Sequence, residues 1–590
     1  MTVARALRPV LGMLPRRADY AGLRRSWPRD LAAGVTVGVV ALPLALGFGV
    51  ASGVGAAPGL VTAVIAGVVA AVFGGSSLQV TGPTGAMTVV LVPLVAAHGP
   101  GVVYPVAVLA GVLVVVAAVL RLGRLLAFVP WPLVEGFTLG IAVVIAAQQV
   151  PSGLGIARPD VENAVGSAAV AVVRFVAAPN WVVLCLLALS VVLTAALPRL
   201  HRSLPASLIA IAAVTLVVEM SGAGVARIGS LPSSLPVPAL PDLGNARDLI
   251  GAAAVVAFLA GLESLLSARV ADGMSDVSRH DPDRELFGQG LANIASGLCG
   301  GLPATGAIAR TAVNARAGAS TRVAALTHAL VLAAIVYAAS GLVGRIPLVA
   351  LAGVLLVTAY RMVERHTTRA VLTSTRGDAL VFILTALCTL AFDLVTAVEA
   401  GLAVAVVLAL VRLAGTARAV REPLTDDGVD RATEHALLAG QVLAYRLDGP
   451  LFFAVADRFL REITATTDVR VVILRLGALD MLDATGARVL GEIVEHLRRQ
   501  GIDVLVKSAD DEHRRLLTAV GTLAPLVERG HVFATLPEAV AHAAEHVAAA
   551  PHPARRARIE PVVPAESSPT NASASDTPTA EPCPTVRTKG

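Results

Sequence analysis

Two stretches of the chain share a short pattern: VTGPTGAMTVV at residues 80–90 and GLPATGAIARTAV at residues 301–313. In each stretch, Thr-Gly-Ala closely follows a proline and leads into a largely apolar run. A proline disfavours continued helix before it, and a glycine lets the backbone approach its neighbours closely. The pattern therefore predicts an extended segment that turns into a short helix, once in each half of the chain.

Composition places both stretches in a membrane protein. The chain has 590 residues, of which 55% are hydrophobic and 15% are charged, and its mean hydropathy is +0.75. Such a chain is far more apolar than an average soluble protein. Apolar runs long enough to cross a bilayer recur along most of it, for example at 102–120, 182–197, 249–266 and 398–413. We predict a polytopic α-helical membrane protein.

The charged and sulfur-containing residues add little chemistry of their own. The net charge of +5 comes largely from arginines that flank apolar runs, so it indicates membrane topology and lipid contact, and no nucleic-acid partner is expected. The segment 1–29 is basic and contains three prolines but no cleavable leader, which predicts a retained cytoplasmic N-terminus. The four cysteines have no metal-ligand spacing: they are Cys185, Cys299, Cys388 and Cys583.

Changes in composition divide the chain into five parts. A polar, charged stretch follows the last apolar run, and the final residues are rich in Pro, Ala, Ser and Thr, which predicts disorder. The expected parts are a cytoplasmic N-terminal segment at 1–29, a transmembrane transporter domain at 30–413, a linker at 414–436, a small α/β domain at 437–548 and a disordered tail at 549–590.

The small domain has strand and helix patterns of its own. VLAYRL (442–447), VRVVILRL (469–476) and IDVLVKS (502–508) read as strands. Between the last two, an amphipathic helix is expected to bury one apolar face, made of Val489, Leu490, Ile493, Val494 and Leu497. These alternating elements predict an α/β fold near the usual size of a domain.

Two copies of the half-helix pattern indicate an inverted repeat, in which two helix N-termini meet near the middle of the membrane. Each N-terminus carries roughly half a positive charge and free amide N–H groups, so the pair could hold a small anion. The alternative is a chance match of two Gly-Pro turns in a chain rich in glycine and alanine.

Ionisable residues in apolar surroundings favour the first reading. Glu263 lies inside an apolar helix with Ser267 one turn on. A carboxylate in a bilayer is costly unless it is paired or protonated, so Glu263 is a candidate for proton coupling, with a structural hydrogen bond as the alternative. Arg310 follows the second motif and either adds a fixed positive charge to the pocket or forms a salt bridge.

The chain resembles the sulfate permease (SulP) family of anion transporters along its whole ordered length. The stretches that carry the resemblance are DLAAGVTVGVVALPLALGFGVASG (30–53), GPTGAM (82–87), RLGRLLAFVPWPLVEGFTLGIAVVIA (121–146), GLESLLSARVADGMS (261–275), ELFGQGLANIASGLCGGLPATGAIARTAVNARAGA (285–319) and FDLVTAVEAGLAVAV (392–406). The family implies fourteen membrane segments in two inverted repeats of seven, arranged as the core and gate domains of the uracil-transporter type, and a cytoplasmic C-terminal STAS domain.

The resemblance also implies an anion site. Carried over residue by residue, it comprises Phe48 in the first span, Thr84, Gly85 and Ala86, then Glu263 and Ser267, and finally Thr305, Gly306, Ala307 and Arg310. Where many relatives have Gln after the first-span proline, this chain has Leu44, which removes a side-chain hydrogen bond from the pocket. The first-span and first half-helix motifs look closest to bicarbonate-type members.

Two further departures bear on coupling and regulation. In the sodium-coupled bicarbonate transporters of the family that this chain resembles, an Asp stands at the position of Glu263 and a Thr at the position of Ile308. The Ile308 side chain has no oxygen that could bind a sodium ion. Anti-sigma antagonists carry a phosphorylated serine where this chain reads Asp483-Ala484-Thr485-Gly486. The phospho-acceptor is missing, and Asp483 or Thr485 is expected to cap the following helix.

The expected function is secondary active transport of a small anion (sulfate, bicarbonate or a dicarboxylate) across the cytoplasmic membrane by alternating access, coupled to protons through Glu263. Three alternatives remain: sodium-coupled bicarbonate transport, nucleobase transport on the same fold, and a membrane-tethered regulator acting through the STAS domain. No enzyme motif, cofactor or metal site is expected. The expected partners are a small inorganic or organic anion, the lipid bilayer and a second copy in a homodimer involving the STAS domain.

Overall fold

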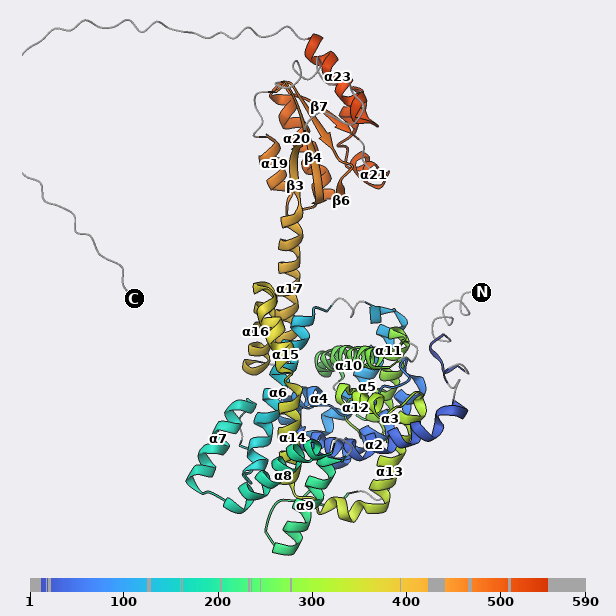
Figure 1. Cartoon of the computed structure of the whole chain (residues 1–590), viewed down its shortest axis with the longest axis vertical. Helices are drawn as coiled ribbons and strands as arrows, with labels where there is room; N and C mark the ends of the chain where they lie inside the picture. The colour runs from blue at the N-terminus through green and yellow to red at the C-terminus, as the bar shows by residue number, and fades with distance from the viewer. Residues whose placement is uncertain are drawn as a thin grey trace, which may run out of the picture. The chain divides into compact units, whose positions relative to one another are not determined.

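The computed structural model describes residues 12–549 apart from gaps at 17–18, 20–22, 125–128, 160, 162, 202–203, 232–233, 235, 243, 245, 276–278, 393, 423–440, 465–468 and 508–510. The chain divides into a membrane unit, Met1–Arg412, and a C-terminal unit, Leu413–Gly590 (Figure 1). All but the first residue of the expected tail, and the larger part of the expected linker, lie outside the described residues.

Among its described residues, the first half of the membrane unit contains eight α-helices and one very short strand, besides a 3-10 turn at Pro100–Val102. They are α2 (Leu23–Ala51), α3 (Ala56–Phe73), β1 (Thr81–Gly82), α4 (Gly85–His98), α5 (Val103–Val119), α6 (Trp131–Gly153), α7 (Ala164–Ala177), α8 (Trp181–Leu200) and α9 (Ala206–Ser221). The helix α2 begins before residue 30, so it includes the last residues of the segment that we expected to precede the membrane domain.

The second half repeats this order of elements. It contains α10 (Ala246–Met274), α11 (Pro282–Leu298), β2 (Thr305–Gly306), α12 (Ile308–Arg316), α13 (Arg322–Gly344), α14 (Leu348–Met362), α15 (Arg365–Ser374), α16 (Arg376–Ala391) and α17 (Leu394–Thr416). In both halves two helices precede a two-residue strand, a short helix follows the strand, and five more helices complete the half. The order therefore matches element by element.

Packing between the halves follows the same symmetry. The helix α2 packs against α13 as α10 packs against α5, and α3 packs against α13 as α11 packs against α5. Away from this group, α6 packs against α16 as α14 packs against α8. Figure 1 shows the two groups side by side, with α2, α3, α5, α10, α11, α12 and α13 in one and α6, α7, α8, α14 and α16 in the other. We call them the core and gate domains of an inverted repeat.

The fourteen membrane segments are the seven matched pairs of helices that remain when α7 and α15 are set aside. Among the described residues, seven helices are long and apolar enough to cross a membrane alone, and α13, which is broken into Arg322–Ile335 and Ala338–Gly344, gives an eighth. The other six segments are shorter: α4, α9, α11, α12, α14 and α16. Half-helices such as α4 and α12 need only reach the middle of the membrane, which explains their length.

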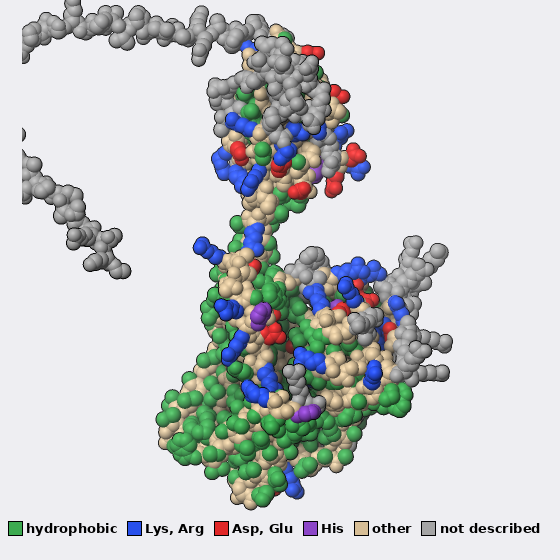
Figure 2. Space-filling view, viewed as in Figure 1, with side chains coloured by type: hydrophobic (Ala, Val, Ile, Leu, Met, Phe, Trp, Pro, Cys, Tyr) green, Lys and Arg blue, Asp and Glu red, His purple; other side chains and the backbone are tan. Residues whose placement is uncertain are grey.

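The outer surface of the gate domain is apolar. In the space-filling view, hydrophobic side chains cover the face formed by α7, α8 and α9 (Figure 2). Exposed apolar residues on these helices include Val173, Val176, Trp181, Val192 and Met220. A continuous apolar surface of this kind is unusual on a soluble protein and suits contact with lipid.

The C-terminal unit is an α/β sandwich. Its strands run in the order β3–β4–β5–β7–β8, with β6 paired to β4 beyond a register shift. All pairs are parallel except β3 with β4. The strands are β3 (Arg418–Glu422), β4 (Val442–Leu451), β5 (Val471–Arg475), β6 (Leu479–Leu482), β7 (Asp503–Lys507) and β8 (Val532–Phe533), and the helices are α19 (Ala456–Thr464), α20 (Ala484–Arg499), α21 (Asp511–Ala519), α22 (Ala524–Val527) and α23 (Leu536–Ala549).

Local predictions for this unit are confirmed where a helix is amphipathic. The helix α20 buries the expected apolar face, and its N-cap is Asp483, whose Oδ1 accepts a hydrogen bond from the Gly486 amide at 2.7 Å. By contrast, β3 lies within residues that we expected to form a linker. Its charged side chains gave no strand signal, because β3 is an edge strand held by backbone pairing from Arg418 to Glu422 against β4.

A buried aspartate ties the start of α2 to the start of α13. The Asp30 side chain has no exposed surface. Its Oδ1 accepts from the backbone amides of Ser320 at 2.7 Å and Thr321 at 3.1 Å, and its Oδ2 accepts from the Thr321 hydroxyl at 2.6 Å. One carboxylate from the first half of the chain thus accepts the hydrogen bonds of the turn that precedes α13 in the second half.

Asp30→Ala should destabilise the membrane unit, because it leaves these buried donors without an acceptor, at roughly 1–3 kcal/mol for each donor that finds no other partner. The measurement is the thermal midpoint of the detergent-purified chain. The matched control is Asp248→Ala, which removes an exposed aspartate from the first turn of α10. Equal midpoints for the two variants would contradict the role given to Asp30.

Candidate functional site

The two half-helices begin where the two short strands cross. Thr81 pairs with Gly306 and Gly82 pairs with Thr305 in an antiparallel register. After the strands, α4 begins at Gly85 and α12 begins at Ile308. The strand pair therefore brings both helix N-termini to one place, as the repeated motif predicts.

The register of the repeat differs from the one that the sequence suggests. The first Thr-Gly-Ala, at 84–86, caps and opens α4, whereas the second, at 305–307, forms β2 and precedes α12. In the structure, the partner of Thr305-Gly306 is Thr81-Gly82. The first Thr-Gly-Ala therefore lies three residues beyond the segment that corresponds to the second in the structure. The correspondence between the two halves follows the backbone pairing of the strands and not the repeated tripeptide.

Side chains of the core domain satisfy the extended backbone on the β2 side. The side-chain amide of Asn293 pairs with both backbone groups of Ala304. Its Oδ1 accepts from the Ala304 N–H at 2.8 Å, and its Nδ2 donates to the Ala304 carbonyl at 2.9 Å. The Thr62 hydroxyl accepts from the Leu302 amide at 2.6 Å. These side chains replace the partners that water would supply outside a membrane.

The same holds on the β1 side. The Asn314 side chain donates to the Leu78 carbonyl at 2.8 Å, and the Thr311 hydroxyl accepts from the Val80 amide at 3.0 Å. The Val80 carbonyl in turn accepts from the Ala307 amide at 2.9 Å. The short helix α12 therefore supplies the side chains that hold the extended segment before α4.

Glu263 links the two motifs directly. Its Oε2 accepts hydrogen bonds from the Thr305 hydroxyl at 2.7 Å and from the Thr84 hydroxyl at 2.9 Å. The two hydroxyl oxygens lie 3.3 Å apart. Three of the predicted site residues, one from α10 and one from each motif, thus meet at a single carboxylate oxygen.

Arg310 supplies a buried cation beside this carboxylate. Its side chain is 2% exposed, its Nη2 donates to the Pro83 carbonyl at 2.6 Å, and it interacts electrostatically with Glu263. Nη1 has no hydrogen-bond partner among the described residues. A Cβ on Gly82 would lie 2.5 Å from Nη1, so a glycine is required for the guanidinium to reach this position.

The first amides of each half-helix have no intrahelical partner. The first backbone bond runs from Thr88 to Thr84 in α4 at 3.1 Å, and from Thr311 to Ala307 in α12 at 2.9 Å. The N–H groups of 85–87 and 308–310 precede these bonds, and they carry the positive ends of the two helix dipoles. Ile308 is 38% exposed, so the N-terminus of α12 borders open space.

The remaining predicted residues take different places. Phe48 is buried and lies against Gly85, where a Cβ would sit 3.5 Å from the ring. Ser267 donates to the Thr311 hydroxyl at 2.9 Å, so it supports the partner of the Val80 amide and does not contact Glu263 through a hydrogen bond. The serine that bonds a motif directly is Ser264, whose hydroxyl accepts from the Gly306 amide at 3.0 Å.

Two buried polar residues near the site were not predicted. Both side-chain polar atoms of Gln79 lack a partner among the described residues, and a Cβ on Gly306 would lie 1.8 Å from its Nε2. His328 is 1% exposed and lies close to the Ala325 backbone and to the Arg310 charge. A polar residue within an apolar run, the signal that identified Glu263, could have pointed to His328, whereas Gln79 lies in a stretch rich in Gly, Ser and Thr and gave no such signal.

Comparison with known proteins identifies the family. The model of the sulfate permease family matches residues 28–385, and that of the STAS domain matches residues 436–539. The chain is 32% identical to "Putative sulfate transporter YvdB" of Bacillus subtilis over 510 residues, which is 84% of this chain and 94% of that protein. It is 30% identical to bicarbonate transporter BicA of Synechocystis over 533 residues, 87% of this chain and 92% of that protein. The chain belongs to the sulfate permease family.

Solved structures agree on the fold. The transmembrane domain of a cyanobacterial bicarbonate transporter BicA matches with a TM-score of 0.59 and 31% identity, covering 63% of this chain and 98% of that one. The overall structure of SLC26A9 matches with a TM-score of 0.79 over 92% of this chain and 95% of that one. Its identity of 16% limits this second likeness to the fold.

Gly85 marks a close contact between α4 of the core and α6 of the gate. A Cβ at Gly85 would lie 2.1 Å from Cδ1 of Ile145. Gly85→Ala should therefore lower the thermal midpoint of the purified chain, by overpacking that costs about 1–3 kcal/mol. Adding Ile145→Val, which removes the Cδ1 methyl, should restore most of the loss. Ile145→Val alone is the control, and a double variant no more stable than Gly85→Ala would show that the clash lies elsewhere.

Proposed function

We propose that this protein is a secondary active transporter that moves a small anion across the cytoplasmic membrane by alternating access, coupled to protons through Glu263. The observation that carries the proposal is the convergence of two half-helix N-termini, Arg310 and Glu263 at the β1–β2 crossing. Family membership supports it, since relatives are named as sulfate and bicarbonate transporters.

Charge explains why an anion suits this place. The two N-termini contribute roughly half a positive charge each, and Arg310 contributes a full one. Glu263 is the negative group that interacts with Arg310. Free amides bind oxyanions through charge and size with little reading of chemical identity, so sulfate, bicarbonate and a C4-dicarboxylate are all candidate substrates.

Coupling follows from the same pair of charges. When Glu263 takes up a proton, Arg310 loses its counter-charge and the site gains one net positive charge. A proton on Glu263 and an anion at the N-termini then stabilise each other, which is a positive coupling between two ligands. The two threonine hydroxyls that donate to Oε2 keep the carboxylate facing both motifs during this exchange.

Close contacts between the domains support alternating access. On the core side, Gly85 faces Ile145 of α6, and Gly47 of α2 faces Leu355 of α14, with a Cβ placed 2.9 Å from the Leu355 Cδ1. Both contacts set a glycine of the core against an aliphatic side chain of the gate. Smooth, apolar surfaces of this kind allow the core to shift against the gate while the site remains intact within the core.

Sodium coupling is the first alternative, and the residue that disfavours it is Ile308. A sodium ion needs oxygen ligands, and the Ile308 side chain at the N-terminus of α12 offers none. Nucleobase transport is disfavoured by Arg310 and the two helix N-termini, because a neutral substrate offers no negative charge to their combined positive charge. A purely regulatory role would leave the site geometry without a use. We propose no enzymatic activity and no cofactor.

Topology and assembly complete the proposal. The N-terminal segment and the STAS domain lie in the cytoplasm, since an even number of segments places both ends of the membrane unit on the same side and the basic N-terminal segment follows the positive-inside rule. The chain forms a homodimer that involves the STAS domain. We expect this domain to act in assembly and trafficking.

The test of this function is uptake by the purified chain in proteoliposomes. Labelled sulfate, bicarbonate and a C4-dicarboxylate are supplied in turn, with an inward proton gradient and then with an inward sodium gradient. We expect one of these anions to accumulate with protons alone. Accumulation that requires sodium would show that sodium, and not the proton, is the coupling ion. Saturable uracil uptake that oxyanions do not inhibit would overturn the proposed substrate class.

Glu263→Gln separates coupling from binding. The amide keeps the size of the side chain and one oxygen for the threonine hydroxyls, but it cannot exchange a proton. We expect proton-driven accumulation to be lost while exchange of anion across the membrane continues. The matched control is Glu135→Gln, at a carboxylate near the start of α6 that accepts from the Trp131 indole at 3.0 Å. Accumulation by Glu263→Gln would rule out Glu263 as the coupling group.

A further inference from the structure

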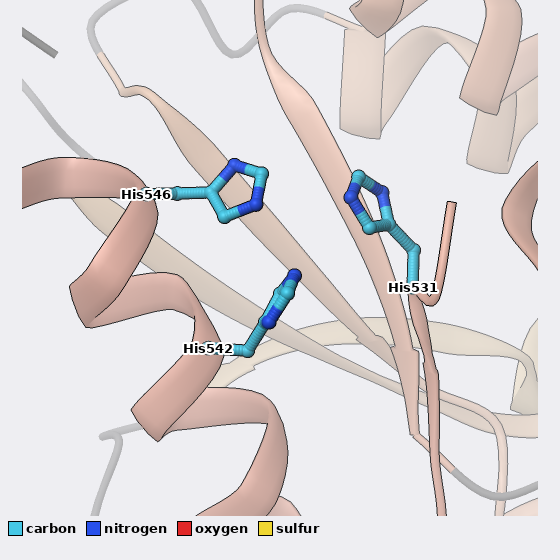
Figure 3. Close-up of side chains that lie close together, drawn as sticks. All are labelled: His531, His542 and His546. Carbon is cyan, nitrogen blue, oxygen red and sulfur yellow. The ribbon is translucent and has the colours of Figure 1, made fainter. Parts of the chain in front are cut away.

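Three histidines of the C-terminal unit converge outside the transport site. His542 and His546 lie one turn apart on α23, and His531 directly precedes β8. Each histidine offers one ligating nitrogen, and the three nitrogens all lie within 4.8 Å of one another. Figure 3 shows the rings of the α23 histidines turned toward the ring of His531. We call these residues the histidine cluster.

The hydrogen bonds of the cluster leave metal-binding nitrogens available. Nδ1 of His531 lies 3.2 Å from the Val504 carbonyl oxygen, and Nδ1 of His546 lies 3.1 Å from Oδ2 of Asp503. A carbonyl and a carboxylate only accept, so in each ring Nδ1 carries the proton and Nε2 keeps a lone pair. Nε2 of His542 is buried with no partner among the described residues.

This arrangement is that of a metal site with its supporting partners. A histidine that binds a metal almost always donates its other N–H to a carboxylate or a backbone carbonyl, which orients the ring and strengthens the ligand. Two members of the cluster have such a partner. The i and i+4 spacing of His542 and His546 places both rings on one helix face, a common arrangement of zinc ligands.

The backbone holds the cluster in place from both sides. The His531 amide donates to the Leu526 carbonyl at 2.8 Å, and its own carbonyl accepts from the Val506 amide at 2.9 Å. The helix α23 is anchored by Leu536, Ala539 and Ala543, which are buried against β4, β5 and β7. The histidines of α23 remain partly exposed, with 27% and 34% of the side chain accessible. They can therefore move inward by the small distance that an ion requires.

Burial favours the form of His531 that an ion needs. It lowers the pKa of His531 from its ordinary value of 6.5, although the Asp503 carboxylate acts in the opposite direction. A neutral imidazole is the metal-binding form. The charged groups that face the cluster are Asp503 from β7 and Glu545, whose Oε2 lies 4.0 Å from the His542 Nδ1.

We infer that the histidine cluster binds one divalent transition-metal ion, with zinc as the best fit, through the Nε2 atoms of His531, His542 and His546. Zinc takes imidazole nitrogens at about 2.0–2.1 Å in tetrahedral geometry. The fourth position faces the open side, where water completes the coordination. The ion ties α23 to the sheet edge at β7 and β8, and it makes the position of this last described helix depend on metal.

The test uses the full chain in detergent, purified with a tag that contains no histidine and stripped with a chelator. Zinc chloride is titrated in competition with a chromophoric chelator, and bound metal is counted by mass spectrometry. We expect one zinc ion per chain. His542→Ala and His546→Ala should each weaken binding by more than about 100-fold, because even the loss of a supporting partner costs about 10–100-fold.

Two further variants distinguish a built site from a pair of surface histidines. Asp503→Asn removes no ligand but weakens the acceptor of the His546 N–H, so it should reduce affinity by about 10–100-fold. His496→Ala, on α20, is the matched control and should bind zinc as the native chain does. His531→Ala with native affinity would mean that the helical pair alone binds, and it would overturn the three-histidine site. The absence of stoichiometric zinc in the native chain would do the same.

Discussion

Backbone that is not helical must find all its hydrogen bonds within the protein when it lies inside a membrane, and the rest of this structure depends on that requirement. The segments before α4 and α12 are extended and buried within the protein. Their backbone groups are satisfied because the two segments pair with each other through β1 and β2. They also form hydrogen bonds with the side chains of Asn293, Thr62 and Asn314. The polar residues of the core helices are therefore the condition for having two helix N-termini at that depth.

That solution also produces the chemistry of the site. Once the strands cross, the hydroxyls of Thr84 and Thr305 lie close enough to share one oxygen of Glu263, and Arg310 lies beside the Pro83 carbonyl. The Arg310 guanidinium, the Glu263 carboxylate and the N-termini of two helices then lie close together in a largely buried place. In such surroundings a change of one proton alters the balance of charge strongly. The coupling of anion and proton binding that we propose rests on this closeness of charges.

The C-terminal unit follows different rules, because water can satisfy its surface. Its α20 helix and its central strands are evident from local periodicity, and the cap of α20 at Asp483 is evident from residue type. The edge strand β3 and the histidine cluster are not. The pattern of β3 is charged and short. His531 is separated from the histidines of α23 by the strand β8, a turn and the first part of the helix. Such features arise from where neighbouring elements end.

For this protein, the sequence by itself determined the membrane class, the two half-helices, the order of the domains and the choice of Glu263 and Arg310 as candidate site residues. Each of these rests on local properties: the length of apolar runs, the position of proline and glycine, and the cost of a charge in an apolar segment. Only the tertiary structure decided that Thr81-Gly82 is the partner of Thr305-Gly306, and that Ser264 bonds the Gly306 amide while Ser267 bonds the Thr311 hydroxyl. The same is true of Gln79, whose side-chain polar atoms have no partner among the described residues, and of the buried His328. These outcomes depend on contacts between residues far apart in the chain, and a one-dimensional pattern carries no information about which of several similar side chains will face which backbone group.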